Sequence, residues 1–217
     1  MLRTRLDAES APGIRYAETT VCAPLGGGLL PRPQLGRVGL IAAWDDDTAF
    51  EGFLTDHQFA EWLDGGWHVR LEPLRAVGAW SGLPDLPDEE REVDDDDPVA
   101  VLTLGRLRLR RAPSFVRTSA RAERDAMQDP GLLAATGLAR PPRLVATFSL
   151  WRNTAAVRAY AHGENGDGHV NALRAHAAQP FHHESVFARF RPYAARGTRH
   201  GRDPLAPERL DTPPLAT

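Results

Sequence analysis

The stretch "LVATFSLWRNTAAVRAYAH" at residues 144–162 decides how the fold is interpreted, because a similar order of residue types occurs at residues 38–57, "VGLIAAWDDDTAFEGFLTDH". Each is an apolar run that ends in Trp, followed by polar residues, a Thr-Ala pair and an amphipathic segment with aromatics at helical spacing. Downstream, "WHVRLEPLRAV" (67–77) matches "ESVFARFRPYA" (184–194) in the alternation typical of a strand. The pattern indicates two copies of one supersecondary unit.

The later copy predicts the element order βαββαβ. Pro113 stands in the first turn of its first expected helix, and Asn153 or Thr154 can cap the next one. This order is that of the split βαβ, or ferredoxin-like, module, in which an antiparallel sheet carries both helices on one face. The expected strands are 99–109, 131–139, 143–151 and 184–190, and the expected helices are 113–129, 154–161 and a short one from His169.

The earlier copy predicts only part of this module. Strands are expected at 13–22, 37–44 and 67–77, with a helix from about 48 to 63, but only about ten residues precede Pro12. The opening strand is therefore missing, and we expect it upstream of the first residue, or else a gap that another chain or the tail fills, since an unpaired sheet edge is a liability. Two such sheets can pack face to face as a dimeric α/β barrel within one chain, with a cavity between them.

The acidic segment "PDLPDEEREVDDDDP" (84–98) divides the two copies. Its self-repulsion and its poor capacity for burial predict a linker. The expected fold class is thus α+β, with a first ferredoxin-like module at 1–83, a second at 99–206, and a Pro-rich disordered tail at 207–217.

Composition excludes several classes of function. All 26 basic residues are Arg, so Schiff-base chemistry and a phosphate-loop lysine are excluded. The net charge of −3 gives no electrostatic footprint for nucleic acid, and the single Cys22 excludes an internal disulfide and a Cys-based zinc cluster. No apolar run approaches the roughly 20 residues of a bilayer span, and the N-terminus lacks the apolar centre of a signal peptide, so we expect a cytoplasmic protein without a transmembrane segment.

Several motifs together resemble one known family. "ATFSLWRNTAAVRAYAH", a downstream His, "FARFRP" and "GTRHGRDPL", all within 146–205, resemble the pattern of the spheroidene monooxygenase family of bacterial carotenoid oxygenases. "LIAAWDDDTAF" and "GGWHVRLEPLRAVGAWSGLP" in the earlier copy are also similar to that family, so the resemblance covers most of 12–206. It implies oxidation of an acyclic carotenoid to its ketone by dioxygen, and a haem-dependent reaction within a dimeric α/β barrel.

The resemblance also implies where a haem b would be held. Related barrels, including chlorite dismutases, dye-decolourising peroxidases and aldoxime dehydratases, hold haem in the second module through a helix His, which here matches His169. Glu184 begins the adjacent strand and could accept a hydrogen bond from the other ring nitrogen of His169. From the residues alone, His169 could equally be a helix-start residue that faces water.

Further candidates lie in the same motifs. Arg152 and Arg189 could hold a propionate or polarise bound dioxygen, and their alternative role is a surface ion pair. Large aromatic residues in these motifs are core residues first, but would contact a flat or long apolar ligand if they face inward. These aromatic residues are Trp67, Phe148, Trp151 and Phe187.

Three histidines invite metal or cavity roles. His182 and His183 are adjacent on a strand and therefore point to opposite faces, which argues against a shared ion. His57 is expected to cap a helix end. His68 alternates with Trp67, so one of these two should face the cavity.

The leading hypothesis is a haem-dependent monooxygenase-like oxidoreductase that oxidises an apolar small molecule, carotenoid-like or a specialised metabolite, with dioxygen or peroxide. Its alternatives are a haem enzyme acting on N–O bonds, a non-catalytic barrel that binds haem or a small molecule, and a cofactor-free monooxygenase in which cavity His and Trp residues act on an activated aromatic substrate. Compatible partners are the apolar substrate, an electron donor that nothing in the chain names, and a second copy of the chain.

Overall fold

The computed structural model describes residues 6–26, 36–83, 86–89, 91, 94–163, 168, 170–172, 174 and 180–206. In these ranges the chain forms seven strands of one antiparallel sheet. They are β1 (Ile14–Ala23), β2 (Val38–Trp44), β3 (Trp67–Gly78), β4 (Val99–Leu107), β5 (Leu132–Arg140), β6 (Leu144–Trp151) and β7 (His182–Gly197). Their order across the sheet is β2-β1-β5-β6-β4-β7-β3.

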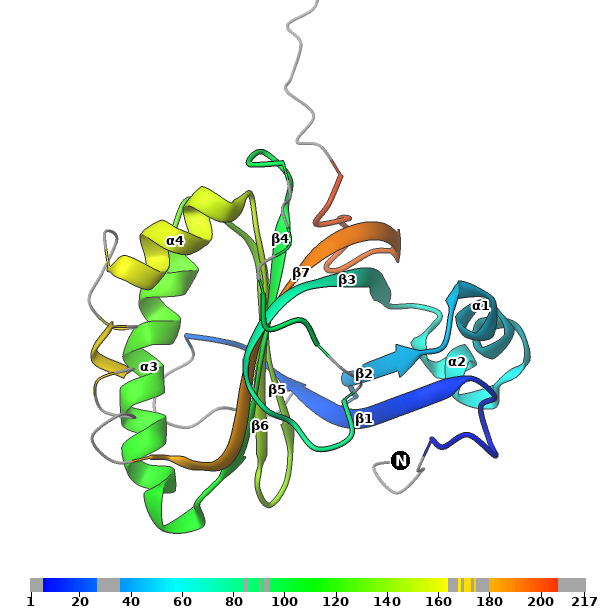
Figure 1. The fold of residues 1–217 in the computed structure, drawn as a ribbon, viewed down its shortest axis with the longest axis horizontal. Helices are drawn as coiled ribbons and strands as arrows, with labels where there is room; N and C mark the ends of the chain where they lie inside the picture. The colour runs from blue at the N-terminus through cyan, green and yellow to red at the C-terminus, as the bar shows by residue number, and fades with distance from the viewer. Residues whose placement is uncertain are drawn as a thin grey trace, which may run out of the picture.

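The helices lie in two groups (Figure 1). They are α1 (Asp47–Asp56), α2 (Gln58–Leu63), a 3₁₀ turn at Leu109–Arg111, α3 (Ala112–Gln128) and α4 (Thr154–His162). α3 and α4 cover one face of the central strands, while α1 and α2 lie on the other side. Asp46 and Asn153 cap α1 and α4 by accepting backbone N–H groups, as the sequence predicts for Asn153. None of the described helices is long and apolar enough to cross a bilayer.

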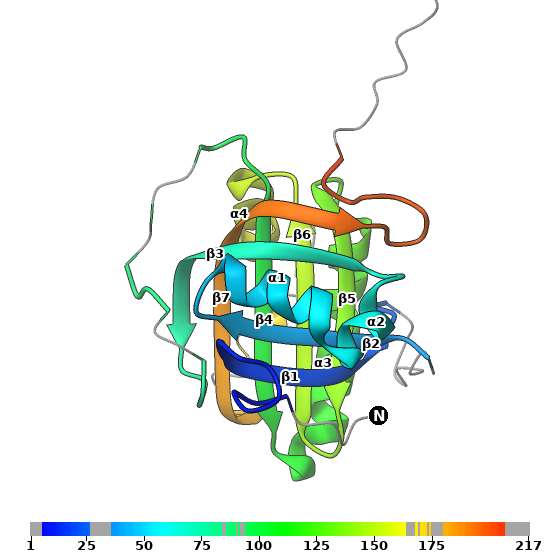
Figure 2. The ribbon, with the colours of Figure 1, turned by 90° about the vertical axis from the view of Figure 1, so that its right-hand side faces the viewer.

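The sheet curls over itself. Figure 2 shows β1, β2 and β3 crossing in front of β4, β5 and β6, with the end of β7 bending to follow β3. The register explains the bend, because residues 182–190 of β7 pair with β4, while its residues 186–197 pair with β3 through two register shifts. The result is an α+β fold with a curled sheet. We call the side covered by α3 and α4 the helix face and the opposite side the concave face.

The duplication predicted from the sequence would place one further strand in this sheet. β4 lies between β6 and β7, so by the same order its counterpart would lie between β2 and β3. No strand of the described residues occupies that place, and residues 6–13 form turns rather than an opening strand. β2 and β3 are therefore the two edges of the curled sheet.

Part of the acidic segment follows the edge of β3 instead of standing clear of the fold. The N–H of Ala76 donates to the carbonyl of Pro87 at 2.7 Å, and the N–H of Arg91 donates to the carbonyl of Leu74 at 3.0 Å. These two bonds satisfy backbone groups that an edge strand would otherwise present to other chains.

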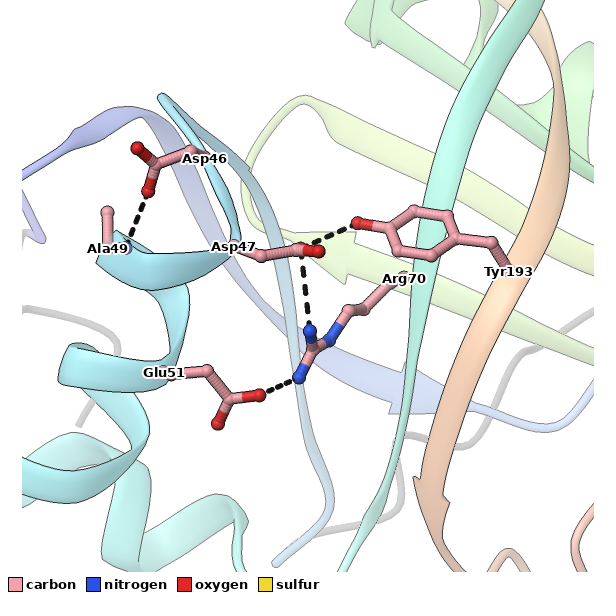
Figure 3. Close-up of polar contacts among 6 residues, drawn as sticks. All are labelled: Asp46, Asp47, Ala49, Glu51, Arg70 and Tyr193. Carbon is pink, nitrogen blue, oxygen red and sulfur yellow. Dashed lines mark hydrogen bonds and ion pairs between the residues drawn. The ribbon is translucent and has the colours of Figure 1, made fainter.

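Helix α1 is tied to the opposite edge of the sheet (Figure 3). Arg70 on β3 pairs with Glu51 and lies 3.5 Å from Asp47, both on α1. Tyr193 on β7 donates from its hydroxyl to Asp47 at 2.7 Å. The Arg70 guanidinium also lies 5.0 Å from the centre of the Phe50 ring. Side chains thus connect α1 to β3 and β7.

The core has three clusters because the alternation along each strand sends side chains to both faces. One lies on the concave face, around residues such as Leu102, Leu104 and Leu150. A second lies under α1 and α2 around Phe53, and a third lies between the sheet and α4 around Trp151. Each helix pair therefore covers its own apolar surface, and the concave face lies between them.

Candidate active site

A buried glutamate pairs with a partly exposed arginine on the concave face, close to where β1 meets β5. Glu18 on β1 is only 4% exposed, and its Oε1 lies 2.6 Å from Nε of Arg140 at the end of β5. Alternation places Glu18 there, because Tyr16 and Cys22 share its face while Ala17 packs under α1 and α2. A carboxylate so deeply buried requires a charged partner, and Arg140 supplies it.

A second charged pair extends this cluster. The indole N–H of Trp80 donates to the hydroxyl of Tyr16 at 2.8 Å. The guanidinium of Arg106 lies 4.7 Å from the centre of the Trp80 ring and donates from Nε to Glu184 Oε2 at 2.6 Å. The backbone N–H of Ser81 also donates to Glu184. We call these residues the polar cluster: Tyr16, Glu18, Trp80, Arg106, Arg140 and Glu184.

The two carboxyl groups of the polar cluster have pKa values shifted in opposite directions. Burial raises the pKa of Glu18 above its usual value, although Arg140 and Arg106 act in the other direction. Burial also acts to raise the pKa of Glu184, but hydrogen bonds from Ser81 and Arg106 outweigh it, so that pKa is lowered. Two carboxyl groups whose surroundings separate their pKa values can divide the roles of proton donor and fixed negative charge.

Tyr16 completes this arrangement as a neutral group. Burial, more than any other cause, raises the pKa of Tyr16 to about 12. Its hydroxyl therefore stays protonated beside Glu18 over the working range of most enzymes. Perturbed titratable groups gathered at a buried place are candidates for a functional site, and the polar cluster meets that description.

An apolar wall lies on the same concave face. Trp67 and Phe148 both pack against the concave core, with ring centres 6.2 Å apart. The indole N–H of Trp67 donates to Asp203 at 3.0 Å. His68 points the other way, with its ring centre 5.6 Å from that of Phe50 in an edge-on arrangement, and burial lowers the pKa of His68. Of the two alternating residues, Trp67 is therefore the one that faces inward.

The other predicted aromatic contacts lie on the helix face. Trp151 is 2% exposed, and its ring centre is 5.0 Å from that of Tyr160 on α4. Phe187 packs against the same cluster. Since the sheet separates these two residues from Trp67 and Phe148, one ligand cannot touch all four.

The remaining predicted residues are also dispersed. His169 lies outside the described residues, and the N–H of its neighbour Gly168 donates to Asp125 on α3 at 2.8 Å. Glu184 belongs to the polar cluster and is already hydrogen-bonded there. Arg152 is exposed, whereas Arg189 is half-buried on the helix face.

The histidines do not converge on one point. The ring centres of His182 and of Phe115 on α3 are 5.2 Å apart in an edge-on arrangement, whereas Nε2 of His183 lies 3.2 Å from Nη1 of Arg143. His57 caps α2 by accepting the backbone N–H two residues on at 3.0 Å, as the sequence predicts. In the part of the chain that the structure describes, no three His, Cys, Asp or Glu side chains are grouped to hold a metal ion.

Comparison with known proteins assigns the chain to a family. No protein-family model matches it. The spheroidene monooxygenase of Rubrivivax gelatinosus is 31% identical over 196 residues, which cover 88% of this chain and 73% of that protein. The chain belongs to the spheroidene monooxygenase family. The members from Rhodobacter capsulatus and Cereibacter sphaeroides are 27% and 25% identical, and the chain covers 89% and 56% of their lengths.

Solved structures share the general arrangement of elements at low scores. A monooxygenase-like protein from Listeria innocua has a TM-score of 0.30 and 12% identity, with 81% of each chain covered. A conserved protein from Methanosarcina mazei has a TM-score of 0.40 and 8% identity, with 46% of this chain and 96% of that chain covered. Scores this low do not bear on function.

Among the described residues of this spheroidene monooxygenase family member, neither the groove between α4 and β7 nor the centre of the concave face is a cavity of haem size. A groove between α4 and β7, to which Phe187 and Arg189 belong, has a volume of about 180 Å³. Cofactor and ligand sites usually measure about 300–1,000 Å³. The centre of the concave face is filled by buried side chains, including Leu104 and Leu150, both 0% exposed.

The sequence did not single out the buried pair of this family member. A signal for Glu18 was available, because it is the one acidic residue within the alternating strand "IRYAETTVCA" (14–23). Nothing in the sequence indicated Arg140 as its partner, because the two lie on strands that only the folded sheet brings together.

Proposed function

We propose that this member of the spheroidene monooxygenase family is an oxidoreductase that inserts one atom of dioxygen into an apolar small molecule at the concave face. The observation that carries the proposal is the buried carboxyl of Glu18, with its raised pKa, on the same face of the sheet as an apolar wall. The relatives are named for spheroidene, so a carotenoid-like polyene is the proposed substrate class.

The apolar wall and the polar cluster would have different roles in the reaction. Trp67 and Phe148 contact the apolar body of the substrate, and Glu18 exchanges a proton at the reacting end. The reaction consumes one dioxygen, two electrons from an external donor and two protons. One oxygen atom enters a C–H bond to give a hydroxyl group, and the other leaves as water after the O–O bond breaks. Arg140 stabilises the Glu18 carboxylate once its proton has left.

The open edge of the sheet would allow entry. β2 and β3 are not paired to one another among the described residues, so access between them needs side-chain movement and no loss of backbone pairing between strands. We further propose that the curled sheet derives from two ferredoxin-like halves of a dimeric α/β barrel, the earlier one lacking its opening strand. The βαββαβ order from β4 to β7 supports this origin.

The test is oxygen incorporation by purified protein supplied with a conjugated polyene, a chemical reductant and ¹⁸O₂. The product should carry one ¹⁸O atom, and Glu18→Gln should lower kcat by about 100-fold or more with KM little changed. Glu72→Gln is the matched control, because Glu72 is a surface carboxyl on β3, paired with Arg191 outside the polar cluster. Absence of ¹⁸O from every product, or equal kcat in Glu18→Gln, contradicts the proposal.

Haem b bound through His169 is a separate proposal, supported by the family resemblance, and we assign it no step of the reaction. Protein purified from haem-supplemented cells should show a Soret band that His169→Ala abolishes. Colourless protein from such cells contradicts haem binding.

A cofactor-free reaction is the second candidate, because a buried carboxyl beside aromatic rings also suits a general base for an activated aromatic substrate. In that case a CH₂ group and dioxygen give a ketone and water with no external electrons. Turnover of an activated aromatic substrate by haem-free protein without reductant favours this candidate, and a strict need for reductant excludes it.

A further inference from the structure

The turn after β3 brings Trp80 onto the concave face, where its indole joins the polar cluster. Trp80 is 6% exposed. Two glycines flank it, Gly78 and Gly82, with φ values of +91° and +92°. A Cβ atom at Gly78 would collide with the carbonyl oxygen of Ser185, and a Cβ atom at Gly82 would lie 3.3 Å from the ring of Tyr16. The backbone of this turn is therefore shaped for close contact between Trp80 and Tyr16.

The hydrogen bond that Trp80 donates determines which way the Tyr16 hydroxyl points. An indole N–H can only donate, so the Tyr16 oxygen is the acceptor in their 2.8 Å bond. The hydroxyl hydrogen of Tyr16 is then available to another acceptor. Glu18, two residues further along β1 and on the same face, forms a hydrogen bond with Tyr16 that acts to lower the pKa of Glu18. Such a bond stabilises the carboxylate, so Tyr16 is its donor.

A charged pair holds the indole itself in place. The guanidinium of Arg106 lies over the Trp80 ring, 4.7 Å from its centre, and Nε of Arg106 donates to Glu184 at 2.6 Å. Glu184 also accepts the backbone N–H of Ser81, the residue after Trp80. One carboxylate thus fixes both the cation over the ring and the turn that carries the ring.

We propose that Trp80 is a positioning residue that keeps the Tyr16 hydroxyl donating to the Glu18 carboxylate. Its place in the reaction rests on the proposed function, in which Glu18 exchanges a proton at the reacting end of the substrate. A hydroxyl that accepts one hydrogen bond donates the next one more strongly, so the indole stabilises the carboxylate without touching it. Trp80 therefore acts on how readily Glu18 gives up its proton.

Two charged side chains among the described residues also act on Glu18 and must be separated from this effect. Arg140 at the end of β5 and Arg106 on β4 both act to lower the pKa of Glu18 through their charge. Trp80→Phe keeps both arginines and an aromatic ring beside Arg106, but it has no N–H to donate. It is therefore the variant that tests positioning by Trp80.

The test follows the ionisation of Glu18 by ¹³C NMR of protein labelled at its glutamate carboxyl groups, with the Glu18 signal assigned by its absence in Glu18→Gln. Tyr16→Phe should lower the acid dissociation constant of Glu18 by about tenfold, because the carboxylate loses a hydrogen bond. Trp80→Phe should lower it by about two- to threefold. Adding Trp80→Phe to Tyr16→Phe should change nothing further, because Trp80 acts through the hydroxyl. An equal shift with and without the hydroxyl, as a merely structural role would give, overturns the proposal, as does an unchanged titration in Trp80→Phe.

The unchanged protein supplies a second measurement, which does not depend on the folding of any variant. The ¹⁵N–¹H signal of the Trp80 indole should shift with pH at the midpoint of the Glu18 titration, while that of Trp62, which is 55% exposed on α2, should not. The pKa of Glu184 is lowered whereas that of Glu18 is raised, so ionisation of Glu184 should appear at a separate, lower pH. A Trp80 signal that does not follow the Glu18 titration overturns the proposal.

Tyr193→Phe is the matched control for Tyr16→Phe, because it removes an exposed hydroxyl bonded to Asp47 and should leave the Glu18 titration unchanged. Neither NMR measurement needs substrate or turnover, so both decide this inference whether or not the protein proves to be an oxygenase. Where oxygenase activity is present, the pH profile of kcat should move to higher pH in Trp80→Phe. An active Trp80→Phe with the pH profile of the unchanged protein contradicts the positioning role and leaves the proposed function intact.

Discussion

The concave face and the helix face of the sheet differ in the charged residues that they carry and in how deeply these are buried. On the concave face, Glu18 is 4% exposed and its pKa is raised by burial, with Arg140 beside it. On the helix face, Arg75 and Arg189 are cross-strand neighbours, and each has a further interaction within the chain. The concave face thus keeps a carboxyl group away from water, whereas these arginines of the helix face are at least partly exposed and have other partners.

The difference also shows how a motif can mislead. In "FSLW" (148–151), Phe148 faces the concave core while Trp151 packs under α4, and in "FARF" (187–190) the two Phe residues likewise point to different faces. Residues that stand together in a family pattern thus lie on opposite faces of the sheet, because successive side chains of a strand alternate.

The largest expected effect comes from truncating the concave core. Leu104→Ala removes a side chain that is 0% exposed and should lower the free energy of unfolding by about 2–5 kcal/mol. Val157→Ala on α4 removes less apolar surface and should cost about 1.5 kcal/mol. Urea unfolding with a common m-value measures both. Equal losses would mean that the two faces are packed with equal tightness.

The second-largest expected loss of stability comes from removing a buried hydroxyl group, and removing an exposed one serves as the comparison. Tyr16→Phe removes the acceptor of the Trp80 indole N–H and should cost about 1–3 kcal/mol, because that donor stays buried. Tyr193→Phe, at a residue that is 50% exposed, removes the bond to Asp47 and should change stability by no more than about 0.5 kcal/mol. The urea midpoint, together with tryptophan fluorescence, measures the stability change of each variant. A Tyr16→Phe variant as stable as the unchanged protein would contradict a buried polar cluster.

The pH dependence of stability tests the two carboxyl groups against each other. Because the folded-state pKa of Glu18 is raised, its contribution is fully present below the usual carboxyl pKa and is lost as pH rises through the folded value. The slope is at most about 1.4 kcal/mol per pH unit, and Glu18→Gln should remove it. The pKa of Glu184 is lowered, so its contribution is present above the usual carboxyl pKa and is lost as pH falls. Across the same pH series, the free energy of unfolding of Glu184→Gln should therefore change with pH in the opposite direction to that of Glu18→Gln. The same pH dependence of stability in the two variants would contradict the assigned directions of the two pKa shifts.

The smallest effect concerns the contacts between α1 and β3. Arg70→Gln removes the pairs with Asp47 and Glu51 and should cost about 0.5–1 kcal/mol, less at high salt. Arg15→Gln, which removes a single exposed pair with Asp45, should have a smaller effect. Unfolding at two salt concentrations measures both, and a larger loss for Arg15→Gln would show that Arg70 does not hold α1.

Local patterns predicted most of the elements. The expected strands and helices from residue 13 to residue 162, and the strand expected at 184–190, are confirmed, to within about two residues at most ends, because burial on one or both faces imposes a period that the sequence must carry. The short helix expected from His169 lies outside the described residues. The expected helix at 48–63 is divided at His57, whose ring caps α2. On α3, Met127 is 48% exposed, whereas Ala120 and Ala126 are buried. Small side chains let α3 approach the sheet, which a search for large apolar residues overlooks.

The candidate site was predictable only in part. Glu184 and Trp67 stood in motifs, and both lie on the concave face. Glu18 and Arg140 were missed, because a charged residue in a strand is normally assigned to a solvated face. Their pairing depends on how the strands of the two halves meet, which no local pattern encodes.

The sequence by itself determined the type and order of the elements, the alternation of side chains along each strand and the family to which the chain belongs. Periodicity and motifs are local, and they do not change with the way the elements are assembled. Tertiary structure alone decided which set of alternating side chains turns inward, where the sheet leaves β2 and β3 as edges, and which carboxyl loses its water. Desolvation is a property of the assembled fold, and it raises the pKa values of Glu18 and Glu123.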